Sequence, residues 1–200
     1  MNFKFPKKNN WGDRYTAQSN FLSQEEIKYI NDNQFSIPYS DTTIEGDKEA
    51  PYEIRSSKLK WLPLNKKWEG LYQKIYNLIN DINSNIWKFN IHFSDEPLQY
   101  TEYKSDDKGH YTWHMDLGGG NSTSKRKISV TIQLSSPNEY EGGDLEFFGL
   151  APYYQPFDLN ILKQQGTAVI FPSYGMHRVT PVTKGIRKSL VLWVGGSHFK

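Results

Sequence analysis

Apolar residues recur at two different spacings along this chain, and the change between them divides the sequence into two parts. In the first part they return every three or four positions, which is the period of an amphipathic helix. A long helix is predicted to start near Asn65, with an apolar face made of Trp68, Leu71, Tyr72, Ile75, Leu78, Ile79 and Ile82. A shorter helix is predicted after Ser23, because Ser23 and Glu26 have the spacing of a capping box and two isoleucines follow.

After about residue 86 the spacing of apolar residues falls to two, which is typical of half-buried strands. The first predicted strand has alternating apolar residues at Trp87, Phe89, Ile91 and Phe93. Further short strands are predicted at 98–103, 110–116, 127–134, 144–149, 167–171, 175–180 and 187–194. Glycine-rich turns at 118–121, 141–144 and 184–185 separate several of them. Many short strands joined by such turns favour a jelly roll over a parallel sheet.

These patterns predict a mainly β protein with flanking α-helices and a double-sheet jelly-roll core. We expect a single domain over residues 1–200, with helical support over about 20–85 and the β core over about 86–196. The segment 36–62 is rich in turn formers and charges, and we predict a loop there with one strand near 52–59. This segment and the aromatic, proline-rich segment 151–165 are candidates for lids over a site or for packed surface loops.

Composition excludes several classes of function. The 24 lysines and arginines nearly balance the 22 acidic residues, so no overall positive charge favours nucleic acid or an anionic membrane. The absence of cysteine excludes disulfides, zinc–thiolate sites and iron–sulfur clusters. No apolar run reaches the roughly 20 residues of a membrane helix, and the first residues lack the apolar core of a signal peptide. We therefore expect a cytoplasmic protein without a membrane partner.

Candidate metal chemistry begins with His114 and Asp116, which stand two positions apart on a predicted strand. Side chains at such positions point to the same face of a strand. His177 lies on another predicted strand and offers a third ligand. Two histidines and one carboxylate form the facial triad of non-haem Fe(II) oxygenases, which leaves coordination positions open. An isolated H-x-D pair is weak evidence, since structural histidines are common, so the interpretation depends on residues downstream.

Arg187 follows His177 by ten residues and opens a predicted strand. If Arg187 faces inward, alternation along the strand turns Ser189, Val191 and Trp193 inward as well. A buried arginine needs an anion, and no acid shares this row. Guanidinium binds carboxylate in a bidentate manner, so the distal end of 2-oxoglutarate is an attractive partner. A core acid remains the alternative.

Four segments of the chain resemble the PKHD-type hydroxylases, a branch of the prolyl-4-hydroxylase-like Fe(II)/2-oxoglutarate dioxygenases. The similarity is strongest over 177–187, where the metal histidine and the arginine ten residues later match the family pattern. Residues 109–116 are similar to its G-x-Y-x-x-H-x-D segment, 140–147 to its Y-x-G-G-x-L turn and 55–57 to its R-[ST]-S element. The resemblance extends over roughly residues 20 to 195, and it implies a double-stranded β-helix with the metal at one mouth.

The resemblance also implies roles for individual side chains. Iron(II) would be held by His114, Asp116 and His177, and 2-oxoglutarate by Arg187 with help from Tyr103. Ser189, which alternation places on the same row as Arg187, is a further candidate for this help. The residues implied to line a peptide groove are Tyr111, Arg126 and Trp193. Tyr103 stands further ahead of Tyr111 than is usual in the family. Collagen-type prolyl hydroxylases carry lysine at the position of Arg187, a difference that favours the PKHD branch.

The activity implied is hydroxylation of an unactivated carbon by dioxygen, with ascorbate as an accessory reductant. The expected substrate is a prolyl residue of a peptide or protein. The alternatives are a free amino acid or other small molecule, nucleic-acid demethylation on the same core, and a non-catalytic metal-binding jelly roll. Demethylases usually carry a second arginine and an asparagine after the first arginine, whereas Lys188 and Ser189 follow Arg187 here. The substrate and oligomeric state stay open.

Overall fold

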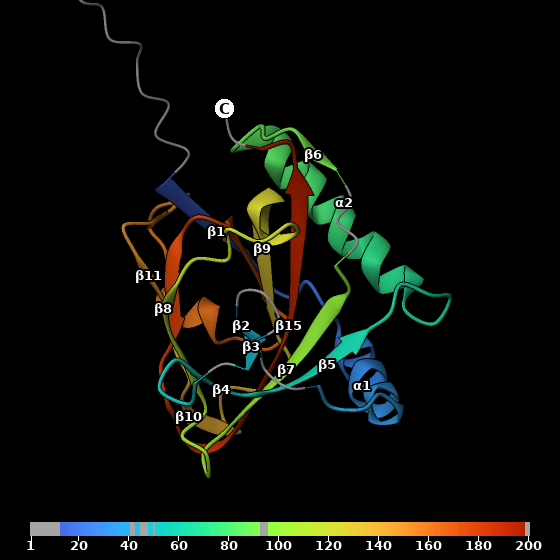
Figure 1. Ribbon diagram of the computed structural model, residues 1–200, viewed down its shortest axis with the longest axis vertical. Coiled ribbons are helices and arrows are strands. Elements are labelled where there is room, and N and C mark those ends of the chain that lie inside the picture. Colours follow the sequence, from blue (N-terminus) through green and yellow to red (C-terminus); the bar gives the residue numbers. More distant parts are fainter. Residues whose placement is uncertain (1–12, 41–42, 45–47, 50, 93–95, 199–200) are drawn as a thin grey trace, which may run out of the picture.

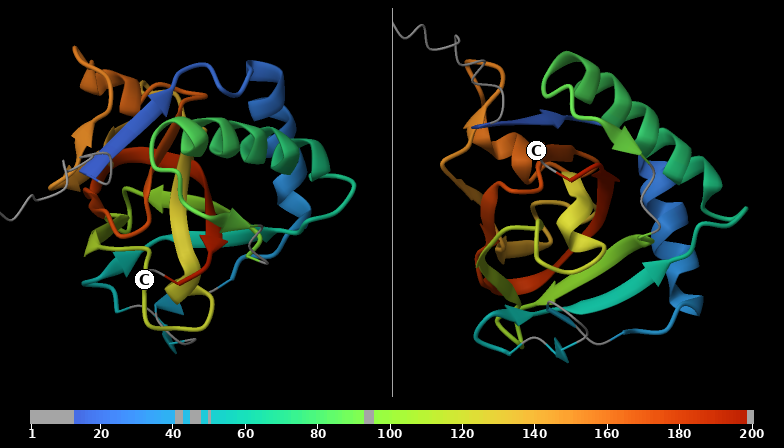
Figure 2. Two further views of the ribbon diagram at one scale, coloured as in Figure 1. Left: turned by 90° about the horizontal axis from the view of Figure 1, so that it is seen from above. Right: turned by 45° about the horizontal axis from the view of Figure 1, so that its top comes forward.

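A computed structural model describes residues 13–40, 43–44, 48–49, 51–92 and 96–198. The β-strands curve into a flattened barrel, and both α-helices lie outside it on one flank (Figures 1 and 2). The fold class predicted from the sequence is therefore confirmed: a mainly β jelly roll with flanking helices. Within the described residues, no helix combines the length and apolar character needed to span a membrane.

The larger sheet forms one wall of the barrel. Its strands, in spatial order, are β12 (Ala151–Pro152), β1 (Arg14–Gln18), β13 (Ala168–Pro172), β9 (Arg126–Gln133), β15 (Val182–Gly196), β7 (Leu98–Lys104) and β5 (Lys58–Leu62). Two short strands, β10 (Tyr140–Gly142) and β6 (Ile91–His92), pair with β15 off this path. Because β15 pairs with both β7 and β9, it fixes the register at the centre of the wall.

The smaller sheet forms the opposite wall. Its order is β11 (Leu145–Phe148), β14 (Met176–Val179), β8 (His110–His114) and β4 (Arg55–Ser56). A separate two-stranded sheet joins β2 (Thr43–Ile44) and β3 (Lys48–Glu49). The helices are α1 (Gln24–Asn33) and α2 (Glu69–Asn85), with 3-10 turns η2 (Gln34–Ser36), η3 (Thr123–Lys125) and η4 (Leu159–Leu162).

The larger sheet turns an apolar face outward, whereas its inward face carries both polar residues and a second, smaller hydrophobic cluster that includes Val169 and Phe171. On β9 the outward residues Ile128, Val130 and Ile132 join the main core, which also contains the buried faces of α1 and α2. Their neighbours Ser129 and Gln133 are buried on the other face. The helices thus supply the apolar partner that the sheet requires, and the space between the two sheets is free to carry polar side chains.

Both predicted helices are present. Ser23 and Glu26 form a reciprocal capping box at the start of α1. The helix α2 begins four residues later than expected, because Asn65 forms a turn in which its side chain accepts a hydrogen bond from the Lys67 amide at 3.0 Å. The predicted apolar face of α2 is buried at its centre, where Ile75 and Ile79 are fully inaccessible. Helical periodicity therefore identified the correct face but not the first turn.

The predicted strand over 87–93 is wrong for most of the residues that the structure describes, since only Ile91–His92 pairs as a strand. Trp87 and Phe89 instead stack on each other at 6.2 Å, and the Asn83 side chain binds both the amide and the carbonyl of Phe89 at 2.9 Å. Phe93 lies outside the described residues. The alternating aromatic pattern therefore belongs to a cap that closes the end of α2.

Two further features differ from the sequence-based expectation. The strand β1 was not predicted, although it joins β13 to β12 in the larger sheet. The predicted turn at Lys184–Gly185 lies inside β15, which pairs there with β10. Gly185 has a φ of +71°, and a Cβ atom at this position would meet the Glu139 carbonyl oxygen at 2.0 Å. The glycine therefore permits a close strand approach and does not end the strand.

Candidate metal centre

Two neighbouring strands of the smaller sheet bring His114, Asp116 and His177 together. The strand β8 ends at His114, Asp116 follows it, and β14 places His177 directly opposite His114. Candidate ligand atoms from the three side chains all lie within 4.8 Å of one another. The Asp116 carboxylate lies 3.7 Å from His114 Nε2 and 3.6 Å from His177 Nε2. These two separations suit atoms that share one cation, since ligands about 2 Å from a metal lie at most about 4 Å apart.

Backbone hydrogen bonds fix the tautomer of both imidazoles. His114 Nδ1 lies 2.7 Å from the Thr112 carbonyl oxygen, and His177 Nδ1 lies 2.9 Å from that of Gly175. A carbonyl oxygen only accepts, so each Nδ1 carries the proton and donates it. Each Nε2 therefore has a free lone pair, and both face the Asp116 carboxylate. This arrangement is typical of metal-binding histidines.

The electrostatics of the cluster favour a neutral His114 imidazole beside an ionised Asp116 carboxylate. Burial and the neighbouring His177 lower the pKa of His114 to about 3. Burial acts to raise the pKa of Asp116, but His177, His114, Arg126 and a hydrogen bond from Ser129 outweigh it, and the pKa lies below its usual value. The cluster therefore offers two nitrogen lone pairs and one negative charge, which is a ligand set suited to a divalent transition metal.

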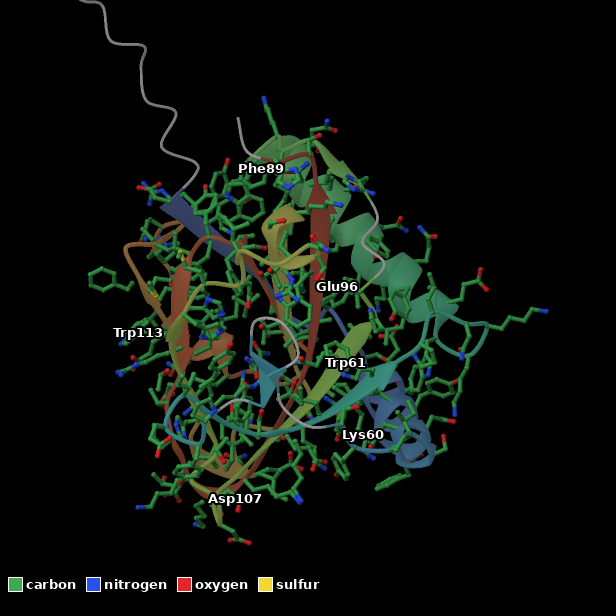
Figure 3. All side chains as sticks on the ribbon, viewed as in Figure 1. Lys60, Trp61, Phe89, Glu96, Asp107 and Trp113 are labelled. Carbon is green, nitrogen blue, oxygen red and sulfur yellow. The ribbon has the colours of Figure 1, made fainter. Side chains whose placement is uncertain are left out.

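The candidate ligands lie where two cavities meet. The outer cavity has a volume of about 440 Å³ and is lined by residues that include Trp61, Glu96, Tyr111, Arg126 and Trp193. Figure 3 shows Trp61 and Glu96 near the middle of the viewed face. The inner cavity lies between the sheets and is lined by residues that include Tyr103, Arg187 and Ser189. Six residues line both cavities: Arg55, Gln99, Tyr111, His114, Asp116 and Trp193.

Arg187 brings into the inner cavity a positive charge that no acidic side chain among the described residues pairs with. Its side chain is 1% exposed, and its Nε and Nη2 atoms have no hydrogen-bond partner among the described residues. Its Nη1 is 3.5 Å from Ser189 Oγ, and its guanidinium lies 5.5 Å from the centre of the Tyr103 ring. In the described part of the chain no ion pair joins Arg187 to an acid, so the core-acid alternative finds no support. A buried guanidinium of this kind fits a carboxylate ligand.

Other buried polar atoms near Arg187 also lack hydrogen-bond partners among the described residues. Strand register places Gln133, Ser189 and Thr101 side by side on three strands, and Thr167, just before β13, accepts a backbone hydrogen bond from Gln133. Gln133 Oε1 and Thr167 Oγ1 are buried without a hydrogen bond to any described residue, as is the Tyr140 hydroxyl. This concentration of unpartnered atoms indicates a place for a polar ligand or for water.

The predicted groove residues Tyr111, Arg126 and Trp193 all line the outer cavity. The Arg126 guanidinium stacks on the Trp193 ring at 3.9 Å. It also donates from Nε to the Glu96 carboxylate at 2.8 Å and from Nη1 to the Asp116 carbonyl at 3.2 Å. Sequence reasoning had not identified Glu96, because nothing in the sequence predicts its contact with a residue thirty positions away.

Arg55 is a second residue whose part in the site was missed, although the R-[ST]-S element that contains it was noticed. It is buried, its guanidinium lies 4.7 Å from the centre of the Tyr111 ring, and Tyr111 in turn stacks on His114 at 3.4 Å. Burial is the main cause that raises the pKa of Tyr111 to about 12, so this phenol stays protonated. The stack of Arg55, Tyr111 and His114 holds one imidazole flat against the wall of the cavity.

The two segments considered as lids lie in different places. Ile54, Arg55, Leu59 and Trp61 from the segment 36–62 line the outer cavity beside the candidate ligands. Residues of the segment 151–165 instead line a separate hollow of about 530 Å³ together with Trp113. Figure 3 labels Trp113 at the left margin of the molecule. Of the described residues in the two segments, only those between Ile54 and Trp61 line the cavity beside the candidate ligands.

Comparison with known proteins agrees with this geometry. The model of the "2OG-Fe(II) oxygenase superfamily" matches residues 98–195. A PKHD-type hydroxylase of Crocosphaera subtropica is 31% identical over 180 residues, which cover 88% of this chain and 75% of that protein. Another from Acidovorax ebreus is 36% identical over 104 residues, which cover 49% of this chain but only 42% of the relative. This chain thus matches less than half the length of some of its curated relatives.

Solved structures share the fold at low sequence identity. A prolyl hydroxylase of Trichoplax adhaerens, in complex with a peptide fragment of a hypoxia inducible factor, has a TM-score of 0.71 at 17% identity. The alignment covers 94% of this chain and 89% of that one. A Pseudomonas putida prolyl-4-hydroxylase has a TM-score of 0.67 at 18% identity, covering 91% and 92% of the two chains. By its sequence relatives and its fold, the chain belongs to the 2OG-Fe(II) oxygenase superfamily and within it to the PKHD-type hydroxylases.

Proposed function

We propose that this chain is an iron(II)- and 2-oxoglutarate-dependent hydroxylase in which His114, Asp116 and His177 hold the metal and Arg187 holds the co-substrate. One observation carries the proposal. The same inner cavity is lined by a cluster of three metal-type donors and by a buried guanidinium that has no anionic partner among the described residues. A cation that keeps open coordination positions and a dicarboxylate would together complete this cavity.

The residues present fit both groups. The cluster offers two imidazole nitrogens and a carboxylate, and Arg187 offers donors that have no partner among the described residues and have the geometry that a carboxylate requires. When bound, iron and 2-oxoglutarate supply the oxidising chemistry that inserts an oxygen atom from dioxygen into a carbon–hydrogen bond as the oxo acid becomes succinate and carbon dioxide. The protein's own contribution is to bind, to orient and to limit the access of water.

Each of these tasks has residues suited to it. Arg187 would anchor the distal carboxylate, with the Ser189 hydroxyl and the Tyr103 phenol as further donors along the same wall. Tyr111 and Trp193 line the junction between the cavities, where their rings would shield the metal from bulk solvent. The substrate would enter the outer cavity and present its carbon–hydrogen bond to the junction.

For the substrate we propose a prolyl residue of a peptide or protein. The outer cavity combines aromatic walls with charged side chains, which suits the apolar ring and the polar backbone of such a residue. The relative from Trichoplax adhaerens was solved with a peptide fragment, and this likeness supports the same class of substrate here. Hydroxylation of a free amino acid, demethylation of nucleic acid and metal binding without catalysis are the alternatives that an experiment must separate.

Turnover against defined substrates tests the proposal. The purified protein is given iron(II), 2-oxoglutarate and ascorbate, together with a library of proline-containing peptides or a matched library with alanine in place of proline. We expect succinate formation and the gain of one oxygen atom, seen by mass spectrometry, only with the proline library. His114→Ala and Asp116→Ala should show neither.

Parallel reactions contain free amino acids or methylated single-stranded oligonucleotides in place of peptides. Oxygen incorporation in one of these, with none in the peptides, would replace the proposed substrate but keep the chemistry. Metal binding without any coupled succinate formation across all substrates would overturn the hydroxylase proposal in favour of a binding module.

A further inference from the structure

The hydroxyl of Ser129 is bonded directly to one of the three candidate metal ligands. Ser129 Oγ donates to Asp116 Oδ2 at 2.6 Å, a short bond of the kind formed with an ionised acceptor. Ser129 is fully buried on β9, in the larger sheet, whereas Asp116 follows β8 of the smaller sheet. The contact therefore ties the carboxylate across the cavity to the opposite wall.

A second serine sets the direction of this bond. Ser173 Oγ lies 3.0 Å from Ser129 Oγ and is equally buried. A serine hydroxyl has a single proton, and that of Ser129 is given to Asp116. Ser173 must therefore donate to Ser129, and the three groups form a chain that runs from Ser173 through Ser129 to the carboxylate. A chain in one direction polarises each bond and strengthens the last.

The turn that carries Ser173 also holds the other strand of the cluster. The Ser173 carbonyl accepts from the Leu117 amide, next to Asp116, at 2.9 Å. Two residues on, the Gly175 carbonyl accepts from His177 Nδ1 at 2.9 Å. The same short turn thus fixes the backbone beside Asp116, the orientation of its carboxylate and the orientation of the His177 ring.

We propose that Ser129 and Ser173 are positioning residues that preset the Asp116 carboxylate for metal binding. This inference rests on the proposed function, because it assumes that the cluster binds a divalent metal. Without the Ser129 hydroxyl, the carboxylate would lose the partner that selects one rotamer, and part of the binding free energy would go into ordering it. Loss of a hydrogen bond to a metal ligand typically costs roughly tenfold to a hundredfold in affinity.

Cobalt(II) binding to the protein without co-substrate or substrate tests the proposal. Titration calorimetry gives the dissociation constant, and the visible absorption of bound cobalt(II) reports the ligand geometry. We expect Ser129→Ala to weaken binding by about tenfold to a hundredfold with a changed spectrum. Ser173→Ala should weaken it less, because Ser173 reaches the carboxylate only through Ser129. Ser129→Thr, which keeps the hydroxyl, should recover most of the affinity.

Ser135→Ala is the matched control. Ser135 lies just beyond the far end of β9 and is also buried, and among the described residues its hydroxyl bonds to the backbone of Ile186 and Lys188 alone. Its loss should lower the thermal stability but leave cobalt affinity unchanged. If Ser129→Ala binds cobalt(II) with wild-type affinity and spectrum, the positioning role is overturned while the metal site stands. If the wild-type protein binds no cobalt(II), the proposed function fails first.

Discussion

The two ends of the inner cavity are built in opposite ways. At the metal end the polar groups are already engaged: His114 and His177 donate to backbone carbonyls, and Asp116 accepts from Ser129. At the other end Arg187 has two nitrogen atoms without a partner, and Gln133 has a buried oxygen without one, within the residues that the structure describes. The polar groups of the metal end thus have hydrogen-bond partners in the absence of a ligand, whereas several of those at the Arg187 end do not.

This difference follows from the ligand that each end suits. A cation needs lone pairs that converge on one point, so the protein must hold those side chains by their remaining atoms. A dicarboxylate brings its own acceptors, so the protein must leave donors free. Burial of free donors destabilises the folded chain until the anion binds. The metal end should therefore respond to mutation mainly through affinity, and the other end through both affinity and stability.

The largest expected effect comes from removal of a metal ligand. We expect His177→Ala to lower turnover by roughly a thousandfold or more, since a metal ion supplies several kcal/mol of transition-state stabilisation. The free energy of unfolding should change little, because the ring lies beside a polar cavity. Succinate formation and cobalt(II) titration measure the first effect, and thermal unfolding the second. Wild-type turnover in this variant would remove His177 from the ligand set.

The substitution Arg187→Met tests the end of the inner cavity that would bind the dicarboxylate. We expect the 2-oxoglutarate requirement to rise by about a hundredfold, because loss of a buried charge pair costs about 3 kcal/mol. Without co-substrate, the same variant should be at least as stable as the wild type, since an unpartnered buried charge has been removed. Steady-state kinetics and thermal unfolding with and without 2-oxoglutarate measure both effects.

Lys188→Met is the control for that experiment. Lys188 is the next residue along β15, and alternation turns its side chain away from the cavity. Lys188→Met removes one positive charge and introduces a methionine, as Arg187→Met does, but at a position outside the cavity. The 2-oxoglutarate requirement should therefore not change. A destabilised Arg187→Met protein in the absence of co-substrate would show that Arg187 already has an anionic partner in the free protein.

Strand alternation explains why much of the site could be predicted from sequence. Period-two geometry orients Arg187 with Ser189 on β15, and it predicted the shared direction of His114 and Asp116, although β8 ends at His114 and Asp116 lies just beyond it. The jelly roll followed from many short alternating strands. The capping box at Ser23 was equally local. These predictions held because each depends on residues close together in the chain.

What could not be predicted depends on contacts between distant segments. Ser129 and Ser173 are ordinary serines in sequence, and only the pairing of β9 with β13 brings them to Asp116. The strand β1 has no strong apolar pattern, and its pairing with β13 across 150 residues decides its structure. At Trp87 the pattern was misleading, because aromatic packing at the end of a helix produced a strand-like alternation.

A smaller effect is expected from pH. In the folded, metal-free protein the burial of His114 lowers its pKa from 6.5 to about 3, so only the unfolded chain takes up the proton between these values. The resulting stability is complete above pH 6.5 and is lost as the pH falls. Between pH 6.5 and about pH 5 the loss should reach at most about 2 kcal/mol.

Denaturant unfolding at several pH values measures this dependence. His114→Ala should reduce it, whereas added cobalt(II) should not, because a metal on Nε2 also keeps the folded-state imidazole unprotonated while the unfolded chain still takes up the proton. If the free energy of unfolding changes equally with pH in the wild type and the variant, His114 is not held neutral by its surroundings. The metal end would then be less fully arranged for its ligand than the comparison with the Arg187 end assumes.

The smallest effect is expected from two buried glutamines, Gln99 and Gln133, that share the inner face of the larger sheet. Gln99 donates from Nε2 to Thr101 Oγ1 at 2.8 Å, whereas Gln133 Oε1 has no partner among the described residues. Gln99→Leu should therefore lower the free energy of unfolding by about 1 kcal/mol, while Gln133→Leu should leave it unchanged or raise it. Denaturant unfolding without ligands distinguishes them. A loss above about 2 kcal/mol for Gln133→Leu would show that its amide is already bonded, and the far end of the cavity would be no less complete than the metal end.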